Sequence, residues 1–511
     1  MTDSSETRSE VQTEQADAPA LPRSDGQVAN ATAAAQSGNA VELLPEFKVS
    51  GCFSSHMVLQ RRKPVRVFGF SRHIGMKVTG SWEGETAESA VDADGRFTLE
   101  FSAREAQREG TKMIVASERG RAEFDDILVG DVWLIGGQSN AECHLAPCIR
   151  TTPELYDRIT PEDNFRLFCQ TQAKAYEFRD NCAEPAYDII DPDWRWQRPD
   201  RDAALNFSAM GYYFAKELTK YTDVPLGLFM ICAGGACLRE LMPAELAVER
   251  GYTLGANMPV GGYYNTLISP LLGLEFYGQL FFQGESEGCW AETAPRYCGD
   301  LAAFVADERA RFHTDFPFYN VQLCSYRTEG AQFFPYHDIV RLEQFDALGA
   351  IPDSYLAVCR DLGAVEGDPD WAHSPYKAEL GRRLAMQVYA YEYGGKAAMP
   401  DPAEYESPVP VRACRVPEGI EVTFKYAGSG LETGGGGALT GFGIRAVDCE
   451  KAQAAEAEIV APDRVLVRCG EEACGAAAEV CFAYGFAAYM ADANLVNSFG
   501  LPAPSFRIAV K

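Results

Sequence analysis

The stretch GGQSNAE at residues 136–142 decides the fold, because it stops an apolar run at residues 129–135 abruptly. A buried strand that breaks on two glycines and then presents a serine can hold a nucleophile at the edge of a sheet. Ser139 is therefore the candidate nucleophile. The rest of the chain has to supply a base, an acid that orients the base, and donors for an oxyanion.

Apolar runs too continuous for half-exposed strands alternate with helical patterns after residue 130. The helical patterns include residues 208–221 and 295–312, and the apolar runs occupy residues 132–135, 226–231, 279–282, 318–323 and 355–358. Strands and helices in alternation predict a parallel sheet with helices on both faces. Ligands of such sheets bind beyond the carboxyl ends of the strands.

Polar residues follow four of the five predicted strands, where such a site is expected. The first strand leads to Ser139, the second to Gly235, and the third to residues 283–286, which read QGES. The fifth leads to Asp370 and His373. Since parallel strands end at a common edge, we expect these residues to lie close together.

His373 is the candidate general base, because Asp370 precedes it in a D-x-x-H arrangement. The carboxylate can then meet one ring nitrogen while the other nitrogen faces the serine. A helix is predicted to begin directly afterwards, with Ser374 as its N-cap and a proline at its first position. His313 and His337, near the ends of predicted helices, are interpreted as solvated side chains.

An acyl-transfer site also needs hydrogen-bond donors aimed at the oxyanion, and each typically contributes about 3 kcal/mol. The candidates are the backbone N–H groups of Ser139 and Gly235 and the side-chain amide of Gln283. Gly235 closes a glycine pair after the second strand, and Gln283 follows the third. All three donors therefore fall at the predicted edge.

Two regions of short alternating strands flank the α/β region. Residues 45–128 contain runs such as RFTLEF at 96–101 and predict a small β-sandwich domain. Residues 399–511 return to this pattern and predict a second β domain. Residues 1–44 are polar and of low complexity, which predicts a disordered tail.

Composition narrows the class of partner and the compartment. A formal net charge of −27 argues against nucleic acid, which normally requires a basic surface. The 16 cysteines are scattered without a C-x-x-C pair, so we expect no metal site and mostly reduced, buried thiols. We recognise no signal peptide and no apolar stretch long enough to span a membrane, and we expect a cytoplasmic protein.

The motifs together resemble the sialate O-acetylesterase family of SGNH-type serine hydrolases. The resemblance extends from about residue 57 to residue 506 and rests on GDVWLIGGQSNAE, FSAMGYYFAKEL, YYNTLISPLLGLEFYGQLFFQGESEG, FYNVQL, HSPYKAELGRRLA and NLVNSFGLPAPSF. It implies a flavodoxin-like, three-layer hydrolase domain with a parallel five-stranded sheet at residues 129–398. It also implies hydrolysis of acetyl esters of sialic acid or related sugars, through an acetyl-enzyme and without metal or cofactor. The implied partner is a small acetylated sugar or oligosaccharide.

In this resemblance, the family's nucleophilic serine corresponds to Ser139, and its glycine after the second strand corresponds to Gly235. The family's histidine near the end of the hydrolase domain corresponds to His373. The acid that orients the base stays open between two residues. Related acetylesterases use either the glutamate of the QGE block, here Glu285, or an aspartate just before the histidine, here Asp370.

Three departures from the family concern the predicted pocket. Ala141 stands where the family usually has methionine, Glu287 where it usually has asparagine, and residues 236–242 lack its tryptophan. We expect Gln138, Asn140 and Glu287 to bind the substrate, and the added carboxylate to disfavour an anionic sugar. Deacetylation of a neutral polysaccharide such as acetylxylan is therefore an alternative. An inactive carbohydrate-binding protein on an esterase scaffold is an alternative of another class.

Overall fold

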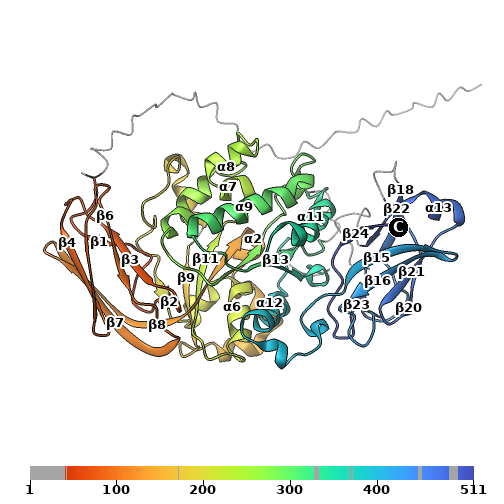
Figure 1. Cartoon of the computed structure of the whole chain (residues 1–511), viewed down its shortest axis with the longest axis horizontal. Helices are drawn as coiled ribbons and strands as arrows, with labels where there is room; N and C mark the ends of the chain where they lie inside the picture. Colours follow the sequence, from red (N-terminus) through yellow and green to blue (C-terminus); the bar gives the residue numbers. More distant parts are fainter. Residues whose placement is uncertain are drawn as a thin grey trace, which may run out of the picture.

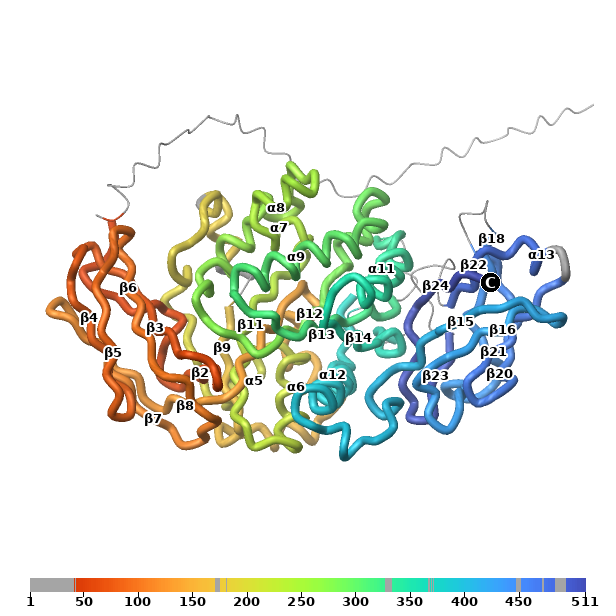
Figure 2. Tube along the Cα trace, in the orientation of Figure 1, coloured from red at the N-terminus to blue at the C-terminus, as the bar shows by residue number. Residues whose placement is uncertain are grey.

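The chain forms three parts that lie in a row, with β structure at both ends and an α/β part between them (Figures 1 and 2). The computed structural model describes residues 41, 43–170, 172–326, 333–365, 368, 370, 372–446, 452–482 and 493–511. Most of the predicted tail, residues 1–40 and 42, lies outside the described residues.

The central sheet contains six parallel strands. In spatial order they are β9 (Phe165–Cys169), β11 (Leu226–Cys232), β8 (Gly120–Gly137), β12 (Gly278–Phe282), β13 (Phe318–Gln322) and β14 (Ser354–Val358). The five predicted strands are confirmed, and the sheet also continues to β9 and the short antiparallel β10 (Trp196–Gln197). The prediction missed β9 because Arg166 interrupts its apolar pattern. The buried guanidinium of Arg166 donates to the carbonyl oxygens of Asp163 and Phe165.

Helices of the central part follow the strands as predicted. The longer ones are α6 (Ala209–Leu218), α9 (Tyr297–Phe312), α11 (His337–Ala350) and α12 (Lys377–Glu392). The shorter ones are α2 (Ser139–Glu142), α3 (Leu145–Cys148), α4 (Gln172–Glu177), α5 (Arg201–Leu205), α7 (Leu238–Leu241) and α8 (Ala244–Glu249). None of the helices in the described ranges is long and apolar enough to cross a membrane.

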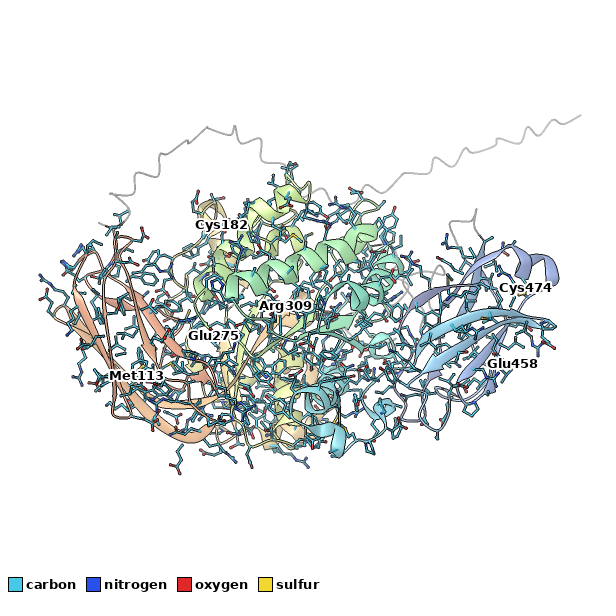
Figure 3. All side chains as sticks on the ribbon, viewed as in Figure 1. Met113, Cys182, Glu275, Arg309, Glu458 and Cys474 are labelled. Carbon is cyan, nitrogen blue, oxygen red and sulfur yellow. A yellow bond between two sulfur atoms is a disulfide. The ribbon has the colours of Figure 1, made fainter. Side chains whose placement is uncertain are left out.

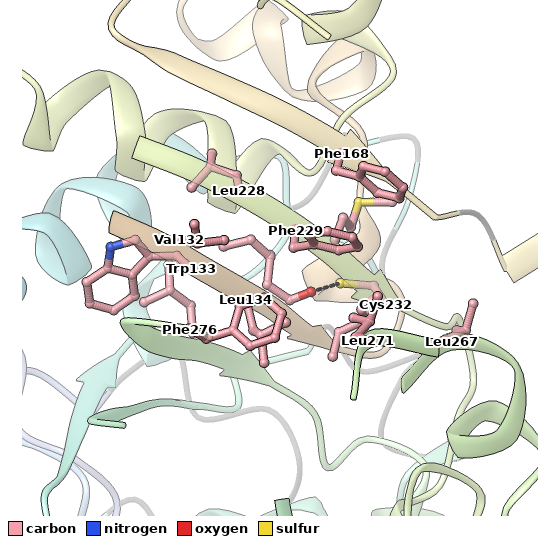
Figure 4. Packing of buried hydrophobic residues seen from close by; sticks show 14 of the residues in the cluster. Val132, Trp133, Leu134, Phe168, Leu228, Phe229, Cys232, Leu267, Leu271 and Phe276 are labelled. Atoms are coloured by element: carbon pink, nitrogen blue, oxygen red, sulfur yellow. Dashed lines mark hydrogen bonds between the residues drawn. The ribbon is translucent and has the colours of Figure 1, made fainter. Parts of the chain in front are cut away.

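The helices cover both faces of the sheet, as Figure 1 shows for α9 on one side and for α6 and α12 on the other. Trp133 of β8 packs edge-on against Phe214 of α6, with ring centroids 5.3 Å apart. Phe281 of β12 packs against Phe304 of α9 at 5.4 Å. Figure 4 shows the buried rings and aliphatic side chains around β8, β9 and β11. This packing holds the strand ends, and hence the site, in fixed positions.

The helix after His373 begins later than predicted. Ser374 is not the N-cap, because α12 starts at Lys377 and has Tyr376 at its N-cap. The hydroxyl of Ser374 instead accepts from the N–H of Tyr376 at 3.2 Å, in a turn before the helix. The predicted apolar face is confirmed, since Leu380, Leu384 and Val388 are buried.

The N-terminal β part joins the central sheet without a break. Its strands are β1 (Lys48–Val49), β2 (Val58–Gln60), β3 (Val65–Phe70), β4 (Lys77–Trp82), β5 (Glu85–Ala90), β6 (Arg96–Phe101) and β7 (Gln107–Ser117). β8 pairs with β7 in its first half and with β11 and β12 in its second half. The apolar core of these strands is continuous with that of the central sheet.

The C-terminal β part has a separate apolar core. Its strands are β15 (Val409–Val416), β16 (Gly419–Lys425), β17 (Glu432–Thr433), β18 (Phe442–Ala446), β19 (Gln453–Ala454), β20 (Ala457–Ala461), β21 (Arg464–Arg468), β22 (Ala477–Phe482), β23 (Leu495–Val496) and β24 (Phe506–Ala509). A short helix, α13 (Glu471–Ala476), carries Cys474, which forms a disulfide with Cys469 (Figure 3). The expectation of reduced thiols is therefore wrong for this pair, while the other described cysteines are free.

Candidate active site

Ser139 opens α2 directly after β8, at the carboxyl edge of the sheet. The turn requires glycine at Gly137, where φ is +130° and an added Cβ would lie 2.0 Å from the carbonyl oxygen of Phe282. Such a conformation is costly for any other residue. Ser139 is half-buried, and its N–H group meets no acceptor in the described part of the chain.

His373 pairs with Asp370, as the D-x-x-H spacing predicted. Nδ1 of His373 lies 2.6 Å from Oδ2 of Asp370. The other oxygen, Oδ1, accepts from the N–H groups of Ala372 and His373 at 2.8 and 3.1 Å. Partial burial acts to raise the pKa of Asp370, but these hydrogen bonds outweigh it and lower the pKa. Asp370 is thus a carboxylate that fixes the ring of His373.

No hydrogen bond joins Ser139 to His373 among the described contacts, although both side chains are accessible. His373 is 35% exposed and its Nε2 atom has no acceptor or donor within the described residues. Hydrogen bonds between nucleophile and base are often long without substrate and shorten when it binds. The ring is therefore available to a substrate and to Ser139.

Glu285 does not contact His373, because its carboxylate points into the protein interior. Oε1 accepts from Nδ2 of Asn140 at 2.7 Å and from the hydroxyl of Tyr326 at 3.0 Å. The side chain is 3% exposed, and burial raises the pKa of Glu285. Of the two candidate acids, only Asp370 touches the histidine.

Asn140 joins three segments rather than facing solvent. Its Nδ2 atom also donates to the carbonyl oxygen of Ala372 at 3.0 Å, and its Oδ1 accepts from Nζ of Lys377 at 2.6 Å. Asn140 is 1% exposed. It therefore ties the residues next to Ser139 to the loop of His373, and this burial does not fit the expected contact with substrate.

Gly235 has an unused N–H group at the end of β11. Its φ is +70°, and its carbonyl oxygen accepts from Nδ2 of Asn257 at 2.7 Å and from Oγ of Ser286 at 2.9 Å. The neighbouring N–H of Gly234 donates to Glu142 at 2.8 Å, whereas that of Gly235 has no acceptor in the described ranges. The N–H groups of Ser139 and Gly235 are thus both available for the expected oxyanion role.

The side chains of Gln283 and Gln138 are buried and form hydrogen bonds within the protein. Nε2 of Gln283 donates to Oε1 of Gln138 at 3.2 Å, to the carbonyl oxygen of Ala236 at 3.1 Å, and to Glu287. Oε1 of Gln138 also accepts from the N–H of Ser286 at 3.2 Å. The two side-chain amides link the ends of neighbouring strands. Their burial does not fit the oxyanion-donor role expected for Gln283 or the substrate contact expected for Gln138.

Glu287 is also buried, which contradicts its expected place in the pocket. It is 3% exposed, and it accepts from the N–H of Leu238 at 2.7 Å and from Gln283. Burial raises the pKa of Glu287 to about 7, although these two hydrogen bonds act to lower it. Its carboxylate is therefore held within the protein and is not presented at the surface.

Glu287→Gln is expected to stabilise the protein more at pH 8 than at pH 5. A folded-state pKa near 7 lies above the unfolded value, so the wild type loses stability as the pH rises through this window. The glutamine does not titrate, and its single amide oxygen can keep only one of these two hydrogen bonds, a loss that is the same at both pH values. The relative gain is about 2 kcal/mol, measured by urea unfolding at both pH values. An equal effect at pH 5 and pH 8 would contradict the raised pKa.

Several residues of the site escaped the sequence analysis. Lys377 is 2% exposed and Tyr326 1% exposed, and both reach the Asn140 amide. His337 was interpreted as solvated, but it is fully buried, stacks on Phe334 at 4.3 Å, and burial lowers its pKa to about 3. Lys377 lies in the quoted motif HSPYKAEL, which could have singled it out; Tyr326 and His337 carry no such signal.

Glu240 is another residue that the sequence analysis did not single out, and it is fully buried. Oε1 accepts from the N–H groups of Ala256, Asn257 and Met258 at 2.7, 2.6 and 2.8 Å, and Oε2 from that of Cys237 at 2.9 Å. The carboxylate thereby holds the loop whose Asn257 contacts Gly235. Within the described residues, no three His, Cys, Asp or Glu side chains converge to hold a metal ion.

Comparison with known families supports an esterase site. Residues 129–390 match the family described as carbohydrate esterase, sialic acid-specific acetylesterase. The chain is similar to sialate O-acetylesterase of Homo sapiens, with 24% identity over 314 residues, and to that of Mus musculus, with 25% identity over 324 residues. These alignments cover 56% and 53% of this chain, and 57% and 58% of the relatives. The chain thus matches little more than half the length of these curated relatives.

A solved structure matches almost the whole chain. It is the crystal structure of a novel carbohydrate acetylesterase from Xanthomonas citri, with a TM-score of 0.76 and 29% identity. The match covers 90% of this chain and 99% of that chain, so the similarity includes the flanking β parts.

Proposed function

The chain belongs to the family of sialic acid-specific carbohydrate acetylesterases, and from this premise we propose that it hydrolyses O-acetyl esters of sugars through Ser139. The observation that carries the proposal is the His373–Asp370 pair, at 2.6 Å, on the loop that Asn140 ties to the Ser139 turn. The unused N–H groups of Ser139 and Gly235 at the same sheet edge support it.

The mechanism follows from these groups. Nε2 of His373 takes the hydroxyl proton of Ser139 while the serine oxygen bonds to the acetyl carbonyl carbon. The carbonyl oxygen becomes an oxyanion, which the N–H groups of Ser139 and Gly235 bind. His373 then gives the proton to the sugar oxygen as the ester bond breaks. Water, activated by His373, releases acetate from the serine in a second cycle.

Asp370 is the proposed acid. It keeps the ring of His373 in the tautomer whose Nε2 can accept a proton, and it stabilises the imidazolium that forms. Glu285 takes a structural part in this proposal, because its hydrogen bonds to Asn140 and Tyr326 brace the residues around the nucleophile.

We assign residues 129–398 to a flavodoxin-like SGNH hydrolase domain, between a β-sandwich domain at 45–128 and a second β domain at 399–511. The order β11-β8-β12-β13-β14 supports this assignment, because it is the 2-1-3-4-5 order of flavodoxin-like sheets, with β9 added at one edge. β8 crosses the proposed boundary at residue 128, so the first two domains share a strand.

Released acetate tests the proposal most directly. The wild-type protein is expected to release acetate from O-acetylated sialic acid or from another O-acetylated sugar, such as acetylated galacturono- or xylo-oligosaccharides. Peptide and phosphate esters serve as controls and are expected to stay intact. If acetylated sugars remain unchanged while long-chain acyl esters are hydrolysed, the proposed substrate class is wrong.

A further inference from the structure

Arg239 carries a buried guanidinium that lies close to two aromatic rings. It belongs to α7, four residues after Gly235, and is 9% exposed. Its central carbon lies 5.1 Å from the ring of Trp290 and 5.6 Å from the ring of Tyr252. Such stacking fixes the plane of the guanidinium and leaves its N–H groups directed outward from the ring faces.

The guanidinium of Arg239 has no hydrogen-bond acceptor and no ion pair among the described residues, and its Nε atom is completely buried. The other buried arginines of the described ranges, Arg61, Arg166, Arg309, Arg341, Arg360 and Arg383, each donate at least one hydrogen bond. Arg309, labelled in Figure 3, is also 9% exposed and donates to the carbonyl oxygens of Phe316, Pro352 and Asp353. An unpaired buried charge is costly unless a bound group satisfies it.

The nearby carboxylates of Asp300 and Glu287 do not accept a hydrogen bond from Arg239. Asp300 binds Arg250 at 2.6 Å and the hydroxyl of Tyr252 at 2.5 Å, and it lies 3.7 Å from Arg296. Glu287 is held by the N–H of Leu238 and by Gln283. Arg239 therefore forms no hydrogen bond or ion pair with either carboxylate, although its positive charge acts to lower the pKa of Glu287.

The segments that carry Arg239 and Trp290 both start at the proposed catalytic edge. Arg239 follows the Gly235 turn at the end of β11, and Trp290 follows the QGES block at the end of β12. The bond from the N–H of Leu238 to Glu287 joins these two segments at 2.7 Å. A sugar whose acetyl group reaches Ser139 would extend past these strand ends.

We propose that Arg239, stacked on Trp290 and Tyr252, binds a carboxylate group of the substrate sugar. The inference rests on the proposed esterase function and names the class of sugar: an acidic one, either a sialic acid or a uronic acid. A planar guanidinium matches a carboxylate through two parallel hydrogen bonds, which a neutral sugar cannot form. Arg239 is then a specificity residue rather than a catalytic one.

The test compares acidic and neutral acetylated sugars in the wild type and in Arg239→Met, which keeps much of the apolar length and removes the charge. Acetate release is measured from O-acetylated sialic acid, acetylated galacturono-oligosaccharides and acetylated xylo-oligosaccharides. The ratio of kcat/KM for an acidic over the neutral sugar is expected to fall roughly 10- to 100-fold in the variant, mainly through KM. The acidic sugar whose kcat/KM ratio falls more in the variant identifies the source of the carboxylate.

Arg311→Met is the matched control, because Arg311 also stacks on a tyrosine, Tyr264, but is already paired with Asp307 and Glu245. Its acidic-to-neutral ratio is expected to equal that of the wild type. An unchanged ratio in Arg239→Met, or a wild type that prefers neutral sugars, overturns the inference and leaves the esterase proposal intact.

Binding of the free acids separates this inference from the esterase proposal. Calorimetry is expected to show that N-acetylneuraminic acid or galacturonic acid binds the wild type at least about tenfold more tightly than Arg239→Met. The expected difference in affinity does not depend on whether the protein hydrolyses an ester. Equal affinities, or no binding to the wild type, overturn the role of Arg239, whereas binding without acetate release from any sugar overturns the esterase proposal alone.

Discussion

Ser139→Ala lowers kcat for an O-acetylated sugar by about 10⁴-fold or more, to the level left by binding and oxyanion stabilisation alone. The methyl group cannot form the acetyl-enzyme, while its backbone N–H, which is expected to bind the oxyanion, is retained. Initial rates of acetate release measure the loss. A fluorophosphonate probe is expected to label the wild type at Ser139 and to leave the variant unlabelled.

Cys143 provides the control for this experiment, because it is a second nucleophile close to the site. The hydrogen bond with Cys148, at 3.5 Å between the sulfur atoms, and the nearby charges of Lys377 and His373 lower the pKa of Cys143. Cys143→Ser is expected to keep turnover within a few-fold of the wild type. If Cys143→Ser loses activity and Ser139→Ala keeps it, the nucleophile is the thiolate.

Asp370→Asn is expected to lower kcat by about 10⁴-fold with little change in KM. The amide oxygen can still accept from the N–H groups of Ala372 and His373, so the loop geometry is preserved. The amide nitrogen then faces Nδ1 of His373 and cannot accept its proton, which selects the wrong tautomer. Steady-state kinetics together with the melting temperature distinguish this loss from unfolding.

Glu285→Gln is the matched variant for the other candidate acid. Its amide oxygen can accept from Asn140 and Tyr326 as the carboxylate does. We expect kcat within about tenfold of the wild type, because no contact with His373 is lost. A large loss in Glu285→Gln together with a small one in Asp370→Asn would assign the acid to Glu285 instead.

The parts of the site that depend on short sequence separations were predictable. Two glycines after an apolar run place Ser139 at a strand end, and an aspartate three residues before a histidine can reach its ring within one turn. The pairing of Asp370 with His373 at 2.6 Å agrees with that local geometry. β9 was not predicted, because Arg166 is buried within the strand and its guanidinium donates hydrogen bonds to nearby carbonyl oxygens.

Burial of polar side chains could not be predicted. Gln138, Asn140 and Glu287 lie beside the nucleophile or the QGE block in sequence, and proximity suggested a pocket lining. Each is at most 3% exposed, and each bonds to a segment 49 or more residues away in the chain, as Glu287 does to Leu238. The direction of a side chain at a strand end depends on these partners, which no local pattern encodes.

The sequence by itself determined the serine turn, the histidine with its aspartate, and the alternation of strands and helices that brings them to one edge. These features depend on local backbone geometry and on the common direction of parallel strands. Only the tertiary structure decided which carboxylate meets His373, that Glu287 is buried, and that Arg239, close to Trp290 and Tyr252, finds no hydrogen-bond acceptor among the described residues. The physical reason is that hydrogen bonding and charge pairing of buried groups are settled by partners that are close in space and distant in sequence.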